Sequence, residues 1–215
     1  MPTVFDFEGF SHRVAETAGR ELANSHSESA LAAAESVHRF TDEALATSGF
    51  DTSMVACEPG CGSCCEVNVA VLEPEVALIV HHLRAERDAS DLQLLAEKAA
   101  TLASRVNGLD DEERLFLREK CIFLDRDGCC SIHPVRPLLC RSVTSTDPER
   151  CRDAIAMVAL GETVQVMTHL DQQEFYQQAF VGLATAMKRH GLPSRSGNLC
   201  ETAARLLNNP DDFTP

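Results

Sequence analysis

The chain has 215 residues, enough for one sizeable hydrophobic core, and its 44% hydrophobic and 24% charged residues are typical of a globular protein. Its net charge of −14 argues against nucleic acid or an anionic membrane as a partner, because binding to phosphates needs a basic surface. Residues 1–8 lack the basic and apolar regions of a signal peptide, and the apolar runs are too short to cross a membrane. We therefore expect a cytoplasmic protein in which the ten cysteines stay reduced.

The first 50 residues are rich in alanine and have the apolar spacing of helices. Val14, Ala18 and Leu22 recur every four residues, and a weaker stripe continues after residue 31. The polar stretch 24–29 interrupts this pattern, so we expect two helices. Three histidines of this segment are expected at the surface: His12, His26 and His38.

The first cysteine array occupies residues 57–65 and reads Cys-Glu-Pro-Gly-Cys-Gly-Ser-Cys-Cys. After it, alternating apolar residues predict a short strand at 67–72. Pro74 is typical of a first helical turn, and a second helix is predicted from Ser90 to Asn107. The acidic pair within residues 110–113 has the spacing of a capping box, which predicts a further short helix.

The second cysteine array occupies residues 121–141. Turn residues at 125–128 separate two short apolar runs, which predicts a β-hairpin with Cys121 and Cys130 at its open end. Two prolines after the hairpin predict an extended loop that continues up to Cys140.

The segment that follows has the signals of a helix start. Asp147 is a good N-cap and Pro148 suits the first helical position. Cys151 then lies in the first turn, on an apolar stripe that we expect to be buried, where the helix N-terminus stabilises a thiolate. Further along, a short strand is expected at 164–168 and a helix at 171–190.

A last helix is predicted after Asn198, and it carries Cys200, which we expect to be remote from the other cysteines and structural. These elements predict a mostly α fold: a single helical domain around a cysteine-rich loop and β-hairpin metal centre. Its expected parts are an N-terminal helical segment (1–50), a metal-binding core (51–152) and C-terminal helices that pack on the core (153–215).

The cysteine spacing indicates metal binding rather than disulfides or inert thiols, given the reducing compartment. Iron–sulfur clusters use four thiolates from Gly- and Pro-rich segments, whereas structural zinc uses four nitrogen or sulfur ligands. We favour an iron–sulfur cluster over zinc, because thiols are abundant and no histidine has the spacing of a zinc ligand. The thiols exceed one four-ligand site, so either two sites exist or some thiols have supporting or redox roles.

Three motifs carry a family resemblance: Cys57…Cys61-Gly-x-Cys64-Cys65, Cys121-x-x-Leu124 and Cys130-Ser-Ile…Arg136-Pro137-x-x-Cys140-Arg141. Together they resemble the YkgJ-like CxxCxxCC cysteine-cluster family, described as a zinc- or iron-chelating domain, over residues 55–152. This chain departs from the family in having three residues between Cys57 and Cys61, where two are common, and in its extra Cys129.

The resemblance implies that eight cysteines are metal ligands: Cys57, Cys61, Cys64, Cys65, Cys121, Cys130, Cys140 and Cys151. Alternation along the hairpin should direct Cys129 away from them. Flagellin lysine N-methylases have a similar motif, so the alternative is an enzyme, either a protein lysine N-methyltransferase or an iron–sulfur oxidoreductase.

No nucleotide loop, nucleophile elbow or HExxH motif supports an enzyme. Four polar residues near the cysteines are nevertheless candidates for cofactor or substrate binding: Arg136, Arg141, His133 and Asp125. We expect instead that they neutralise thiolates and hydrogen-bond the loops. A third hypothesis is an interaction scaffold for an unidentified protein partner, in which zinc replaces a hydrophobic core.

Overall fold

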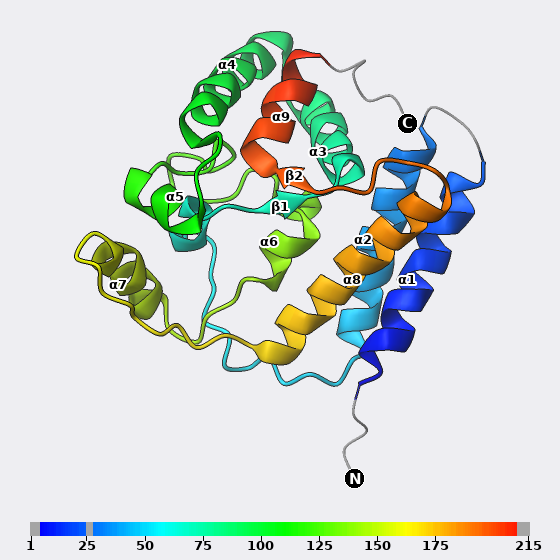
Figure 1. Cartoon of the computed structure of the whole chain (residues 1–215), viewed down its shortest axis with the longest axis horizontal. Coiled ribbons are helices and arrows are strands. Elements are labelled where there is room, and N and C mark those ends of the chain that lie inside the picture. Colours follow the sequence, from blue (N-terminus) through cyan, green and yellow to red (C-terminus); the bar gives the residue numbers. More distant parts are fainter. Residues whose placement is uncertain (1–4, 25–27, 210–215) are drawn as a thin grey trace.

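Figure 1 shows the computed structural model of the chain, which describes residues 5–24 and 28–209. Within these residues the protein consists of nine α-helices, two short 3-10 helices and one two-stranded sheet. This confirms the predicted mostly α, single-domain fold. In the same part of the chain, no helix is both long and apolar enough to span a membrane. The expectation for His26 lies outside the described residues.

One side of the molecule is a three-helix bundle of α1 (Phe7–Leu22), α2 (Ser29–Ala46) and α8 (Leu170–Arg189) (Figure 1). The two helices predicted in the first 50 residues are thus confirmed. Aromatic rings fill the centre of the bundle, where Phe10 stacks on Phe175 with 4.2 Å between ring centroids. Apart from the Tyr176 hydroxyl, the buried residues of this core are apolar, and none of them is a cysteine.

A second group of helices packs around α9 (Leu199–Asn208), which contacts both α3 (Glu73–Glu86) and α4 (Ala89–Val106) (Figure 1). The helix predicted to begin at Ser90 begins one residue earlier, because Asp88 is its N-cap and accepts a hydrogen bond from the Asp91 amide. The core of this group extends into the second cysteine array.

The strand expected at 67–72 is reduced to two residues, β1 (Ala70–Val71), which pairs antiparallel with β2 (Gly197–Asn198). Its partner comes from the far end of the chain, and the pairing holds α9 against α3. The strand expected at 164–168 is wrong, because this segment pairs with no strand and the Met167 carbonyl accepts a single backbone bond from Thr146.

The two short helices near the arrays begin where their caps predict. The capping box before α5 (Asp111–Leu117) is present in both directions, between Asp110 and Glu113. Asp147 caps α7 (Pro148–Val158) by accepting from the Glu149 amide at 2.8 Å. The apolar stripe of α7 is only partly covered, because this helix lies at the edge of the molecule against α5 and the first array, and none of its residues is buried (Figure 1).

The second array is more compact than the sequence suggests. The hairpin is present only as an isolated bridge between Leu124 and Cys130. The predicted extended loop is wrong, because a 3-10 helix η2 (His133–Val135) and a short helix α6 (Leu138–Ser142) replace it. The buried Glu75 carboxylate accepts the Leu138 amide at 2.8 Å, and this caps the α6 N-terminus.

Candidate metal centre

The two cysteine arrays lie face to face. The Cys121 amide donates a 2.7 Å hydrogen bond to the Cys65 carbonyl in η1 (Ser63–Glu66). Glycines permit this approach: a Cβ on Gly128 would lie 2.8 Å from the Gly60 carbonyl oxygen. Both glycines also have a positive φ, which other residues rarely adopt. The loops therefore meet at a contact that larger residues would prevent.

Four cysteines form what we name the outer group: Cys57, Cys61, Cys64 and Cys151. The Cys57 thiol lies 3.9 Å from the Ser145 carbonyl oxygen. Burial raises the pKa of Cys57, and the other three cysteines are close enough to add to that rise. Packing of α7 against η1 brings the Cys151 segment to this side. Cys57 is exposed and the other three are partly exposed, so the outer group faces solvent.

The remaining four ligand candidates form the inner group: Cys65, Cys121, Cys130 and Cys140. The last three pack against the apolar core shared by α3, α4 and α9. Burial raises the pKa of the Cys121 thiol to about 12 and that of Cys140 well above its ordinary value. Without a compensating cation, these surroundings favour the neutral thiols.

Cys64 and Cys65 connect the two groups. Cys64 and Cys65 are neighbours in η1, and the interaction between their thiols lowers the pKa of Cys64 and raises that of Cys65. The positive charge of Arg136, which is partly buried nearby, also lowers the pKa of Cys64. Cys64 is therefore the thiol best prepared to be a thiolate.

The guanidinium of Arg141 is hydrogen-bonded to other groups of the protein. It donates to the Asp42 carboxylate at 2.6 Å, to the Arg136 carbonyl at 2.9 Å and to the Pro134 carbonyl at 2.9 Å. These contacts connect the second array to α2. They agree with a role in hydrogen-bonding the loop.

The expectation of a surface position is wrong for His38, which is 5% exposed, whereas His12 is exposed. The His38 ring lies beside the Arg141 guanidinium and 3.8 Å from the fully buried Glu75 carboxylate. A signal was available in the sequence, because His38 continues the stripe of small buried residues that faces the rest of the bundle: Ala30, Ala33, Ala34 and Val37.

The other polar candidates have separate surroundings. Asp125 accepts hydrogen bonds from the amides of Asp127 and Cys129, so its carboxylate closes the hairpin turn. His133 is exposed at the start of η2. Burial and, to a smaller extent, the negative charge of Asp125 raise the pKa of Cys130, so Asp125 lies near the inner group.

Cys200 is buried, but it is not remote: it lies within electrostatic range of Cys121. Arg114 of α5 is 1% exposed, and its positive charge opposes the rise in pKa that burial causes at both thiols. Sequence reasoning missed Arg114, because nothing in this short, charged helix indicates that its arginine is buried.

No three His, Cys, Asp or Glu side chains in residues 5–24 and 28–209 lie close enough together to hold one ion. The donor chemistry nevertheless fits a soft metal or cluster, since thiolates select zinc and iron–sulfur centres. The buried arginine beside the inner group also fits an anionic centre. Ligation by each of the eight cysteines stays a prediction.

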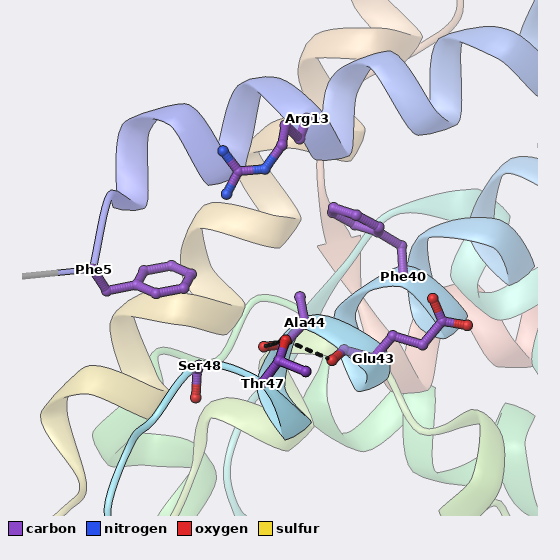
Figure 2. A pocket seen from close by; sticks show the side chains of 7 residues that line it. All are labelled: Phe5, Arg13, Phe40, Glu43, Ala44, Thr47 and Ser48. Atoms are coloured by element: carbon purple, nitrogen blue, oxygen red, sulfur yellow. Dashed lines mark hydrogen bonds between the residues drawn. The ribbon is translucent and has the colours of Figure 1, made fainter. Parts of the chain in front are cut away.

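A cavity of about 430 Å³ lies away from the cysteines, between α1 and α2 (Figure 2). Its lining consists of Phe5, Arg13, Phe40, Glu43, Ala44, Thr47 and Ser48. Thr47 bonds the carbonyls of its own helix. Nothing in this lining resembles a metal site or a catalytic set.

Comparison with known proteins places the cysteine region in a family. A family model named CxxCxxCC, described as "Putative zinc- or iron-chelating domain", matches residues 56–178. No curated protein and no solved structure matches the chain. The family match includes both arrays, α7 and the first part of α8, and it extends beyond the region expected from the motifs. Because the match covers more than half of the chain, the protein belongs to the CxxCxxCC family.

Proposed function

We propose that this protein holds a metal centre through its cysteine thiolates, and that the centre is an iron–sulfur cluster, with zinc as the alternative. The observation that carries the proposal is the arrangement of the eight cysteines that match the family. They come from distant segments of the described part of the chain, which the fold brings together as the outer and inner groups, although no three of their thiols lie close enough to hold one ion. Four thiolates are the set that either kind of centre requires.

Each group would have its own role in holding metal. The inner group would provide a protected site, since its thiols rest on an apolar core. The outer group would provide an accessible site that exchanges metal more readily, since it faces solvent. An iron–sulfur cluster would supply one-electron chemistry, whereas zinc would supply cross-links between the loops.

The alternative of an enzyme has less support. Arg141 was a candidate for binding a cofactor or substrate, but its donors are engaged by Asp42 and two carbonyls. Arg136 remains available, and its effect on Cys64 favours a role in stabilising thiolate charge. We therefore propose no methyl transfer or other reaction. The reducing cytoplasm is the compartment in which we expect these thiols to bind metal.

The test is anaerobic purification followed by analysis of iron, acid-labile sulfide and zinc. We expect brown protein with iron and sulfide in equal amounts. Because the chain has no tryptophan and one tyrosine, its own ultraviolet absorbance is weak, so the ratio of visible to ultraviolet absorbance of a loaded protein should be high. If the protein is colourless and contains stoichiometric zinc, the centre is a zinc site and not an iron–sulfur cluster. Absence of both metals, even after reconstitution of the reduced protein, would contradict the proposal.

Serine variants provide the matched controls, because serine keeps the size of cysteine but is a poor ligand for soft metals. Cys61→Ser, Cys130→Ser and Cys140→Ser should reduce the metal content. Cys129→Ser and Cys200→Ser should leave it intact. Loss of metal from Cys200→Ser, with Cys140→Ser still fully loaded, would show that the site belongs to other thiols.

A further inference from the structure

Arg114 is a buried cation with no anionic partner in the described part of the chain. Its side chain is 1% exposed, and its Nε and Nη1 atoms have no hydrogen-bond partner. No carboxylate in residues 5–24 and 28–209 lies within salt-bridge distance of it. Arginine does not lose its proton in proteins, so this charge persists.

Arg141 provides an internal comparison, since it is buried to a similar extent at 6% exposure. Its guanidinium is bonded to the Asp42 carboxylate and to two carbonyl oxygens. Burying a charge is strongly unfavourable unless it is paired and hydrogen-bonded. Arg141 satisfies this requirement within the protein, and Arg114 does not.

Leu117 of the helix that carries Arg114, and Ile122, the residue after Cys121, pack against the apolar cluster that contains Cys200. Cys200 packs with Leu102 and Val106 of α4 in a small apolar cluster. Burial raises the pKa of Cys200 and of Cys121, and the Arg114 guanidinium opposes that rise at both. A neutral thiol is a poor acceptor, but a thiolate that binds metal keeps negative charge and accepts hydrogen bonds.

We propose that Arg114 is the buried counter-charge of the metal–thiolate centre, acting on the Cys121 thiolate. This inference rests on the proposed function. A divalent ion with four thiolates keeps about two negative charges, which a buried guanidinium partly neutralises. Arg114 is thus a positioning residue that favours the loaded state. In the metal-free protein the same charge is unpaired and destabilising.

The test is an anaerobic titration of the reduced, metal-free full chain with Zn²⁺, in competition with a chromophoric chelator. Arg114→Met should weaken Zn²⁺ binding by about 10- to 100-fold, the usual effect of removing an outer-sphere partner. Arg114→Lys, which keeps the charge, should recover part of the affinity. Arg105→Met is the matched control, since Arg105 lies on neighbouring α4, is half-exposed and pairs with Glu119. It should bind Zn²⁺ as the natural protein does.

The melting temperature of the metal-free protein is a second readout. It distinguishes a counter-charge role of Arg114 from a general structural role. The metal-free Arg114→Met protein should melt at the same temperature as the metal-free natural protein or higher, because the variant removes an unpaired buried charge. Unchanged Zn²⁺ affinity in Arg114→Met would overturn the inference. So would equal weakening by Arg105→Met, or a lower melting temperature of metal-free Arg114→Met. Failure of the natural protein both to bind Zn²⁺ and to take up an iron–sulfur cluster on reconstitution would instead refute the proposed function itself.

Discussion

The three-helix bundle and the cysteine arrays are held together by different means. In the bundle, fully buried aromatic and aliphatic side chains from α1, α2 and α8 form a continuous core. In the first array, by contrast, no residue from 57 to 66 is buried. The array is connected to its surroundings by backbone hydrogen bonds such as that from Cys121 to Cys65. Apolar burial therefore explains the bundle and does not explain the array.

This difference indicates which region of the protein would depend on a bound metal for its stability. A segment without a core must be ordered by other bonds, because fixing each backbone residue costs about 1–2 kcal/mol of conformational entropy. Thiolate–metal bonds can supply that stabilisation, as they do in small metal-dependent domains. The bundle needs no such contribution, since Phe10 and Phe175 are fully buried within it.

Removal of the metal should have the largest effect and should separate the two regions. Structural zinc contributes on the order of 10–16 kcal/mol of apparent binding energy. Chelation, or Cys64→Ser, should lower the melting temperature and expose the first array, residues 57–65, to protease, while α1, α2 and α8 stay protected. Hydrogen exchange or limited proteolysis with mass spectrometry will locate the change. A melting curve unaffected by complete metal removal would contradict this prediction.

A mutation in the bundle should have the converse effect. Phe175→Ala should destabilise the protein by about 3–5 kcal/mol, because it leaves a cavity among the stacked rings. Metal content should stay that of the natural protein under conditions where the variant is folded. Val181→Ala is the matched control on α8, since Val181 is half-exposed. It should change stability by less than about 0.5 kcal/mol in a denaturant titration. Loss of metal from Phe175→Ala would show that the regions are not independent.

Local signals predicted local structure. Asp110 and Asp147 mark the starts of α5 and α7, because a cap acts within its own first turn. The strand at 67–72 was overestimated, since its partner at 197–198 is distant in sequence and matches only two residues. Helix α6 was missed because the carboxylate that caps it belongs to α3.

The same distinction applies to the site. The family motifs singled out the cysteines, since their spacing is visible in the sequence. Their division into an outer and an inner group depends on how α7 and the second array fold against η1. The burial of Arg114 and His38 depends on tertiary packing alone. A sequence shows which side chains are available, but charge burial is decided by neighbours from other elements.

The smallest predicted effect is on the pH dependence of stability. It should differ between the metal-free and metal-loaded proteins because of the thiols of the inner group. Burial raises the pKa of Cys121 from 9.0 to about 12 and raises that of Cys140 as well. Above the ordinary thiol pKa the unfolded chain therefore binds fewer protons than the folded one, so the free energy of unfolding decreases as pH rises. The loss is at most about 1.4 kcal/mol per pH unit for each thiol.

Denaturant titrations of the metal-free protein between about pH 8 and 10 should show this decline. In the loaded protein the ligating thiols are already deprotonated, whereas the thiols of the unfolded chain still carry protons at about pH 8, so the free energy of unfolding should rise with pH instead of declining. Burial also raises the pKa of Tyr176, but this residue belongs to the bundle and titrates in both forms. The difference between the two curves therefore isolates the thiols. Parallel curves would mean that Cys121 and Cys140 do not bind the metal.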